Sequence, residues 1–453
     1  MKKNPRILVV GGLAAGPSAA SKAKRINKDA EVILFERTQY ISYGICEIPY
    51  YLTGEYKDKT NLVVYSPDRL QKEKKVVVHT ETDVASIDRR NKIIQVKDLK
   101  TGVRRKEEYD KLIITTGSVP RRLTFMDSPI SNVFTVKELA RAYELHSFLK
   151  THKPKRAVII GAGYIGLEMA EALHHLDIDV TLIHRHPYPL SKIDEHNGKL
   201  LSSVLKESGI HFVSDTSVKS FGKSGDGTVK TVVTDNGVFD ANLVISAIGV
   251  IPNVAIAEEA GIETGRLGGI KTNEKQCTND DAIFAAGDCC EVRNLITRRP
   301  SYIPLATVAS KMARTAGENA AGGSSVFKGA IRNIALRIFD HEVSRVGLTT
   351  DEADEAGYNI VTETIEAPSR VIGMPGAGRL TVTCHGDKSS GKLLGATLVG
   401  KDGAVHRGNV LAAMIQMGGT LKDISNLDMM YAPPFSPLWD PVIVAANQTL
   451  KKL

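Results

Sequence analysis

The chain has 453 residues, of which 42% are hydrophobic and 24% charged, and its formal net charge is +8. This length exceeds what one hydrophobic core usually serves, so we expect two or three domains. No apolar run reaches the roughly 18 residues that a membrane span needs, which indicates a globular protein with no membrane association. The basic residues are scattered and no basic block carries interleaved aromatics, which argues against a nucleic-acid partner.

The five cysteines form neither a CxxC motif nor a cluster with histidines at metal-ligand spacing. This odd number and this spacing indicate a reduced compartment, without structural disulfides or a bound metal. The first residues, MKKNPRILVVGGLAAG, superficially resemble a signal peptide, but Pro5 interrupts the short apolar stretch. We therefore expect a cytoplasmic protein.

The first unit of the chain follows a strand–turn–helix–strand plan. The strand RILVV leads into the glycine turn GGLAAG, a helix through about Arg25 and the strand EVILFE. In such a unit the start of the helix holds a pyrophosphate, and an acid about 20 residues on binds a ribose hydroxyl. Glu36 follows Gly16 at this spacing, although Leu13 replaces the usual middle glycine. The unit therefore predicts a dinucleotide site.

A second copy of this plan covers residues 156–185, with RAVII, GAGYIG, a helix through about His175 and DVTLIHR. Its turn carries the complete glycine pattern, at Gly161, Gly163 and Gly166. The second copy is therefore the cleaner dinucleotide signature of the two.

The second copy lacks the ribose-binding acid, because its second strand ends in His184, Arg185 and His186. A ribose hydroxyl needs an acceptor, whereas a 2′-phosphate needs a guanidinium or an imidazolium. We expect NADPH rather than NADH, bound through Arg185; the alternative is that Arg185 only points to solvent.

Two dinucleotide folds in one chain indicate a flavin, FAD, and a nicotinamide cofactor placed face to face. TTGSVP closes a strand with small residues, and IFAAGD places Asp288 after a strand and a glycine, where a carboxylate suits the ribityl chain of the flavin. The residues expected to bind the cofactors are Gly11, Gly12, Ala14, Gly16, Glu36, Arg37, Thr116, Gly117, Gly161, Gly163, Tyr164, Ile165, Gly166, Arg185, Gly249, Gly287, Asp288, Pro304, Leu305 and Ala306.

From about residue 328 the chain changes to strands and short helices without a nucleotide turn, which indicates a third, α+β domain. The predicted fold class is α/β, with two Rossmann-like dinucleotide-binding domains and a C-terminal α+β domain for dimerisation. The predicted boundaries are 1–117 for the first part of the FAD-binding domain, 118–248 for the NAD(P)-binding domain, 249–327 for the second FAD-binding part and 328–453 for the interface domain.

Along essentially its whole length the chain resembles the pyridine nucleotide–disulfide oxidoreductases. It is similar to their single-cysteine branch of coenzyme A disulfide reductases, NADH oxidases and peroxidases, and CoA-dependent persulfide or polysulfide reductases. The diagnostic stretch is ISYGICEIPYYLTGEY, in which Tyr51 stands where two-cysteine members carry their second cysteine. The resemblance implies that Cys46 takes electrons from FAD without a resolving cysteine.

Local structure around Cys46 suits a reactive sulfur. Pro49 and the residues after it indicate a helix that begins near Cys46, and a helix dipole would lower the thiol pKa below roughly 8.5. Glu47 stands where most relatives have glycine. Its carboxylate would raise the thiol pKa if close, or would handle protons, and the sequence leaves both open.

The resemblance also bears on the electron acceptor. Ala14 stands where oxidase and peroxidase relatives carry a histidine, which argues against oxygen or peroxide as the natural acceptor. CoA-linked relatives carry basic residues on the first helix, matched here by Lys24 and Arg25, and a YxP segment, matched at Tyr65. With Arg69, these residues are the predicted CoA-binding set; the alternative is a solvated helix face.

The segment YAPPFSPLWDP resembles the part of the dimerisation domain that reaches the active site of the partner in a homodimer. The resemblance implies that Tyr431, which opens the segment, protonates a leaving thiolate. The predicted function is an FAD-dependent NAD(P)H oxidoreductase that reduces CoA disulfide, CoA persulfide or polysulfide through Cys46. The alternatives are a water-forming NAD(P)H oxidase, an electron-transfer subunit of a larger complex, and a scaffold or nucleic-acid-binding protein.

Overall fold

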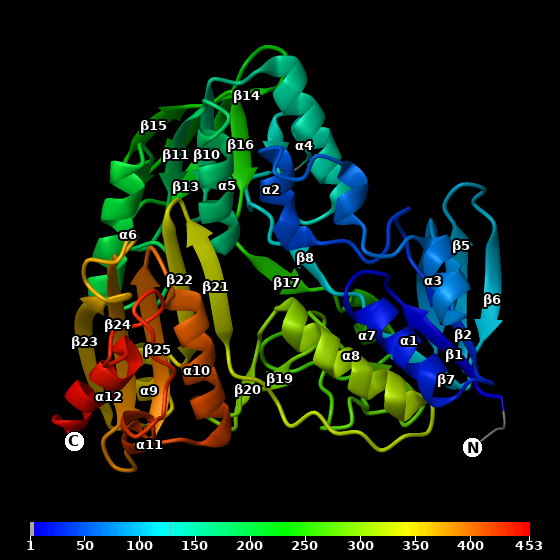
Figure 1. Cartoon of the computed structure of the whole chain (residues 1–453). Coiled ribbons are helices and arrows are strands. Elements are labelled where there is room, and N and C mark those ends of the chain that lie inside the picture. Colours follow the sequence, from blue (N-terminus) through cyan, green and yellow to red (C-terminus); the bar gives the residue numbers. More distant parts are fainter. Residues whose placement is uncertain (1–3, 127) are drawn as a thin grey trace.

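The structure is a computed structural model that describes residues 4–126 and 128–453. Two parts of the molecule are built on parallel five-stranded sheets, and the third is built on an antiparallel five-stranded sheet (Figure 1). This architecture confirms the predicted α/β class, with two Rossmann-like parts and a C-terminal α+β part.

The first parallel sheet has the strand order β18-β7-β1-β2-β3 and carries two long helices, α1 and α8, side by side on one face (Figure 1). The two helices approach closely because a Cβ at Gly317 of α8 would lie only 2.2 Å from the backbone oxygen of Ala19 in α1. The elements of this part are β1 (Arg6–Val10), α1 (Ala15–Ile26), β2 (Glu31–Phe35), α3 (Pro67–Lys74), β3 (Val77–His79), β7 (Lys111–Ile114), α7 (Ala255–Glu259), β18 (Ile283–Ala285) and α8 (Ala306–Ala320).

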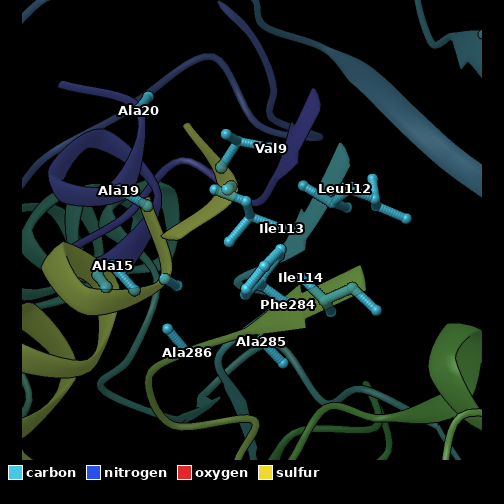
Figure 2. Close-up of a cluster of buried hydrophobic side chains, with 14 of the residues drawn as sticks. Val9, Ala15, Ala19, Ala20, Leu112, Ile113, Ile114, Phe284, Ala285 and Ala286 are labelled. Carbon is cyan, nitrogen blue, oxygen red and sulfur yellow. The ribbon is translucent and has the colours of Figure 1, made fainter. Parts of the chain in front are cut away.

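Small residues set the distance between this sheet and its helices. Figure 2 shows Ala15 and Ala19 of α1 beside Val9, Ile113 and Phe284, which come from three neighbouring strands. Alanine lets the helix lie close to the sheet, and the buried branched side chains supply most of the apolar area removed from water. This packing fixes the start of α1 at the carboxyl end of the strands.

The second parallel sheet has the order β12-β11-β10-β16-β9, and its strands β10 and β16 are buried except for Arg156. A separate three-stranded antiparallel sheet contains a hairpin at Asn236 and Gly237, which joins β14 to β15. The elements are β9 (Val133–Phe134), α4 (Leu139–His152), β10 (Arg156–Ile160), α5 (Tyr164–His174), β11 (Asp179–Ile183), α6 (Glu195–Glu207), β12 (His211–Val213), β13 (Val218–Lys223), β14 (Val229–Thr234), β15 (Gly237–Asp240) and β16 (Leu243–Ser246).

Two antiparallel connections join the nucleotide-binding parts, because β8 (Ser118–Pro120) pairs with β17 (Val250–Pro252). The segment that carries Cys46 forms η1 and α2 and lies between β2 and β3 in the chain. Its helix α2 packs against α4 and α5. The remaining elements are η1 (Ile45–Glu47), α2 (Ile48–Leu52), η2 (Lys59–Leu62), the meander β4 (Thr82–Asp88), β5 (Ile93–Asp98) and β6 (Arg104–Glu108), and the pair β19 (Val292–Arg293) and β20 (Pro300–Ser301).

The C-terminal part is an antiparallel sheet in the order β21-β22-β25-β24-β23, with α10 on the strands β22 and β25 and α12 on β23 and β24 (Figure 1). It shares a hydrophobic cluster with the second nucleotide-binding part, in which Ile334, Leu336 and Ile338 of β21 take part, and Arg337 adds an ion pair of 3.2 Å with Glu171. The elements are β21 (Asn333–Ile338), β22 (His341–Gly347), α9 (Thr350–Glu355), β23 (Ile360–Pro368), β24 (Arg379–Asp387), β25 (Leu393–Gly400), α10 (Ala404–Met417), α11 (Leu421–Ser425) and α12 (Pro441–Leu450).

Candidate active site

The first glycine turn brings β1, α1 and the end of β2 together. Gly11 has a φ of +103°, and a Cβ there would lie 2.3 Å from the backbone oxygen of Thr115. A Cβ at Gly16 would lie 1.8 Å from the carbonyl oxygen of Gly11, so α1 packs directly on the turn. Glu36 Oε2 accepts a hydrogen bond of 2.7 Å from the N–H of Gly12. The predicted ribose-binding acid therefore lies at the glycine turn.

The start of α1 is open to an anionic ligand. The helix has 12 residues, its N-cap is Ala14, no side chain caps it and its first turn holds no acid. Its first N–H groups therefore lack a side-chain cap, and the helix dipole favours a negative charge in front of them. Ala14 and Arg37 are exposed beside this turn.

The second glycine turn repeats this geometry. Gly161 has a φ of +103°, and a Cβ at Gly166 would lie 1.8 Å from the carbonyl oxygen of Gly161. No atom lies within 4 Å of the position that a Cβ at Gly163 would take. Tyr164 and Ile165 begin α5, which also lacks a side-chain cap and a first-turn acid. The open space at Gly163 therefore gives a pyrophosphate close access to the backbone.

His184 occupies the place in the second fold that the acid holds in the first. Its Nδ1 accepts a hydrogen bond of 3.2 Å from the N–H of Ala162, and its Nε2 lies 3.4 Å from Ser191 Oγ. Burial, followed by the positive charges of His186 and Arg185, lowers the pKa of His184 to about 4. A neutral His184 therefore supports the turn, while Arg185 is exposed and His186 is partly buried, with Arg185 Nε 3.2 Å from His186 Nε2.

Asp288 lies where the flavin ribityl chain is predicted, directly after β18. Its Oδ2 accepts a hydrogen bond of 3.0 Å from Ser118 Oγ and lies 3.4 Å from Lys137 Nζ. Gly287, at φ +90°, lets this loop meet α1, because a Cβ there would lie 3.0 Å from the Cβ of Ala15. The sequence analysis missed Lys137, which nothing in its local sequence distinguishes from a surface lysine.

Two predicted cofactor residues, Thr116 and Gly117, lie at the crossing between the nucleotide-binding parts. Thr116 Oγ1 donates to the backbone oxygen of Asn253 at 2.6 Å, and the Asn253 N–H donates to Gly117 at 2.9 Å. Gly117 and Gly249 both have positive φ, and no atom lies within 4 Å of a Cβ built on either one. The start of α8, which no side chain caps, carries three more residues predicted to bind a cofactor, namely Pro304, Leu305 and Ala306.

Cys46 lies in η1, directly before α2. The predicted lowering of its thiol pKa is wrong. Partial burial raises the pKa of Cys46, as do the carboxylates of Glu168, Glu47 and Asp288, while Lys137 lowers it. The residue keeps exposed surface. The helix after Cys46 has only five residues, so its dipole is weak compared with three nearby acids.

Glu47 lies close enough to Cys46 to act on it, which answers the question that the sequence left open. Its carboxylate folds back over Gly44, where an added Cβ would lie 2.3 Å from Glu47 Cδ and 2.5 Å from both oxygens. Burial raises the pKa of Glu47 itself. Gly44 therefore allows a partly desolvated carboxyl group next to the sulfur.

Glu168 is the acid that most raises the thiol pKa, and the sequence analysis did not select it. It lies four positions after Tyr164, one turn further along α5, in the stretch GYIGLE. Burial and the neighbouring Glu171 raise the pKa of Glu168 to about 7, against the opposing effect of Arg337. An acid one turn into a glycine-turn helix is the sequence signal that identifies it in retrospect.

Two of the predicted CoA-binding residues lie together. The guanidinium of Arg69 stacks on the ring of Tyr65, with 4.6 Å between Arg69 Cζ and the ring centroid. Helix α3, which carries Arg69, packs against α1, which carries Lys24 and Arg25. Arg25 is exposed, but Lys24 donates to the backbone oxygen of Ala30 at 2.7 Å. This hydrogen bond uses one of the three donors of the Lys24 ammonium and leaves two for a phosphate.

Tyr431 is half exposed in the irregular segment between α11 and α12. Figure 1 shows these two helices at the lower left, beside the antiparallel sheet, and α2 in the upper middle beside α4. The buried Arg407 holds the segment, because its Nε donates to Asp440 at 2.8 Å and its Nη2 donates to the backbone oxygen of Phe435 at 3.3 Å. The C-terminal part exposes several apolar side chains, both in this segment and outside it, at Ile372, Met417, Met430, Phe435, Leu438 and Trp439.

The geometry fits FAD and a nicotinamide nucleotide. Each nucleotide-binding part offers an uncapped helix start at a glycine turn, and in the second part Gly163 leaves room for a pyrophosphate beside the backbone. Among the described residues, no group of three or more His, Cys, Asp or Glu is arranged to hold a metal ion. In the same part of the chain, no helix has the length and apolar character that crossing a membrane requires.

Comparison with known proteins agrees with this geometry. The chain is 35% identical to the NAD(P)H coenzyme A polysulfide/persulfide reductase of Pyrococcus horikoshii, over 99% of this chain and 98% of that protein. It superposes on the NAD-dependent persulfide reductase from A. fulgidus with a TM-score of 0.95 and 34% identity, covering 99% of this chain and 83% of the other. It superposes on the water-forming NADH oxidase from Lactobacillus brevis with a TM-score of 0.94 and 30% identity, covering 99% of both chains.

The match extends over both halves of the architecture. Residues 5–313 match the pyridine nucleotide-disulphide oxidoreductase family, and residues 335–441 match the dimerisation domain of that family. The predicted dimerisation domain and homodimer are thereby confirmed, and FAD and NAD(P)H are the cofactors that the family implies. The chain belongs to the pyridine nucleotide-disulphide oxidoreductases.

Proposed function

We propose that the protein is an FAD-dependent NADPH oxidoreductase that reduces coenzyme A disulfide, coenzyme A persulfide or polysulfide through Cys46. The observation that carries this proposal is a lone sulfur in a site built for proton and electron transfer. Cys46 faces Lys137, Glu168, Glu47 and Asp288. The other cysteines are Cys277, Cys289, Cys290 and Cys384, of which the last three are buried. Since Tyr51 stands at the usual resolving position, the second sulfur must come from the substrate.

The residues of the chain have distinct tasks in this reaction. The thiolate of Cys46 attacks the disulfide or persulfide sulfur of the substrate, which forms a mixed disulfide and releases a thiolate or hydrosulfide. When bound, FAD would take a hydride from NADPH and pass this electron pair to the mixed disulfide, whose cleavage would release the second thiolate of the substrate and regenerate the Cys46 thiolate. Lys137 stabilises negative charge on the sulfur, and Glu168, with a pKa of about 7, holds a proton near it. The partner's Tyr431 protonates the leaving thiolate.

The coenzyme is NADPH in this proposal, because the edge of the second fold is cationic. Where Glu36 stands in the first fold, the second has a neutral His184, which the exposed Arg185 and the partly buried His186 follow. A guanidinium binds a phosphate with charge-assisted hydrogen bonds, and no acid at the expected ribose position repels that phosphate.

Coenzyme A is the proposed carrier of the substrate sulfur. The adenine and phosphates of CoA need a flat apolar surface and cations, and Arg69 stacked on Tyr65 provides both beside α1. Arg25 adds a further exposed cation on α1. Five free cysteines also favour the cytoplasm as the working compartment.

An anaerobic NADPH titration of the purified holoenzyme tests the proposal. We expect a long-wavelength thiolate-to-flavin absorption band after reduction, and its loss on adding CoA disulfide or polysulfide. The Cys46→Ser variant should accept electrons from NADPH but lack the band and the activity toward these acceptors. Reoxidation of the wild type by oxygen alone would contradict the sulfur acceptor and leave the nicotinamide and flavin roles standing.

A water-forming oxidase is the second candidate, supported by the close superposition on the Lactobacillus brevis enzyme. Ala14 offers no proton donor at the first turn, which disfavours peroxide cleavage there. Stoichiometric water formation, at a rate that competes with CoA disulfide reduction, would favour the oxidase.

A further inference from the structure

A residue of the dimerisation part contacts the edge of the nicotinamide nucleotide site. Arg345 lies on β22, and its Nη1 donates a hydrogen bond to the backbone oxygen of Ser191 at 3.2 Å. Ser191 belongs to the segment 184–192, which follows β11 and carries Arg185 and His186. The segment that presents the cations for the nucleotide is therefore held from outside its own fold.

Two further anchors of this segment lie on one residue of the glycine turn. The N–H of Ala162 donates to His184 Nδ1 at 3.2 Å, and the carbonyl of Ala162 accepts from the N–H of Leu190 at 2.8 Å. The backbone oxygen of His186 is held from another loop, by the N–H of Asp215 at 3.3 Å. Ser191, which Arg345 holds, directly follows Leu190, so this contact belongs to the set that fixes the segment around Arg185.

The backbone around Ser191 needs external support. Leu190 has a φ of 57° and Lys192 has a φ of 66°, so Ser191 stands between two side-chain-bearing residues in the left-handed region. Such residues cost free energy and persist where surrounding contacts hold them. Leu190 is buried, and Arg345 supplies a hydrogen bond to the carbonyl between the two.

Arg345 is itself held at this position rather than free to bind the nucleotide. The charged groups facing it are Arg332, Glu352 and Asp194, and Glu352 also pairs with Arg332 and caps α9. Tyr164, at the start of α5, also lies near it. Arg345 therefore contacts Ser191 in segment 184–192 and also lies near Tyr164 at the dinucleotide turn.

We propose that Arg345 is a positioning residue for coenzyme discrimination, which fixes segment 184–192 so that Arg185 and His186 meet the 2′-phosphate of NADPH. The inference rests on the NADPH preference proposed above. Loss of the hydrogen bond loosens the segment, so discrimination falls, while the chemistry at Cys46, in a different part of the molecule, continues.

The test compares Arg345→Ala and Arg345→Lys with Arg185→Ala and with Glu355→Gln in the holoenzyme. Glu355→Gln is the matched control, because it removes another contact of the same segment with the dimerisation part, the exposed pair Lys192–Glu355 at 3.5 Å. Calorimetry gives Kd for NADP⁺, NAD⁺ and 2′,5′-ADP, and anaerobic flavin reduction gives the rates with NADPH and NADH.

For Arg345→Ala we expect Kd for NADP⁺ and 2′,5′-ADP to rise about fivefold, the size of one net hydrogen bond, with Kd for NAD⁺ changed less than about twofold. The limiting rate with saturating NADPH should stay near the wild-type value. Arg345→Lys should restore part of the affinity, and Glu355→Gln should match the wild type. In the Arg185→Ala background, Arg345→Ala should add nothing to the loss of discrimination.

Equal losses for NADP⁺ and NAD⁺, or additivity with Arg185→Ala, would overturn the inference. If the wild-type enzyme prefers NADH, the proposed coenzyme is wrong and the inference fails with it. If it prefers NADPH but Arg345→Ala binds NADP⁺ normally at full flavin content, the inference alone fails. None of these readouts depends on the identity of the sulfur acceptor.

Discussion

Glu36 and His184 are counterparts in the two nucleotide-binding folds. Each follows the second strand of its fold and accepts a hydrogen bond from the second residue of the glycine turn, at 2.7 Å from Gly12 and at 3.2 Å from Ala162. One turn is supported by a carboxylate and the other by a buried neutral imidazole. The second fold therefore keeps the support of its turn without a negative charge near the nucleotide ribose.

Replacing Arg185 tests whether having His184 in place of an acid serves the binding of the 2′-phosphate of NADPH. We expect Arg185→Ala to lower kcat/KM for NADPH about tenfold, because a charge-assisted phosphate contact is lost, and to leave NADH within about twofold. Steady-state rates with both coenzymes and a dye acceptor measure the ratio. An unchanged ratio would mean that Arg185 only faces solvent.

A pair of glycine substitutions separates folding from nucleotide binding. Gly166→Ala places a Cβ 1.8 Å from the Gly161 carbonyl and should destabilise the protein by about 1–3 kcal/mol, as overpacked sites do. Gly163→Ala meets no atom within 4 Å, so its thermal midpoint should stay near the wild type. Its Kd for NADP⁺ should nevertheless rise, because the pyrophosphate approaches there. A Gly163→Ala protein with normal affinity would place the pyrophosphate elsewhere.

Glu168→Gln tests the acid beside Cys46. Burial and Glu171 raise the pKa of Glu168 to about 7, so the folded protein loses stability as the pH rises from about 4.5 to 7 and the carboxyl ionises. The neutral glutamine avoids this loss, so the variant should gain thermal midpoint over the wild type at pH 8 but not at pH 5. Removing the charge should also shift the titration of the Cys46 thiolate band to lower pH.

Glu47→Gln serves as the matched comparison, since it removes a second carboxylate near the same sulfur. It should shift the thiolate titration in the same direction but less, because Glu168 has the larger effect on Cys46. Identical titrations in all three proteins would show that neither carboxylate acts on the sulfur.

The repeated pattern of the sequence predicted the two glycine turns, their helices and Glu36 correctly, because each depends on neighbours in the chain. Helix α8 begins only at Ala306, since β20 and the extended residue Leu305 come before its start. Such boundaries depend on tertiary contacts.

The environment of Cys46 shows why site chemistry is harder to predict than fold. The local rule of a thiol before a helix predicts a lower pKa, but Glu168 arrives from α5, and Asp288 from the loop after β18. Lys137 likewise reaches this site from a distant segment. No pattern within a short window of sequence contains these contacts.

The proposed action of Tyr431 on the Cys46 of the partner has a genetic consequence. In a mixed dimer of one Cys46→Ser chain and one Tyr431→Phe chain, one active site carries both lesions and the other carries neither. The isolated mixed dimer should therefore keep about half of the wild-type activity. Co-expression, in which random pairing makes about half of the dimers mixed, should restore about a quarter, whereas each allele alone stays impaired.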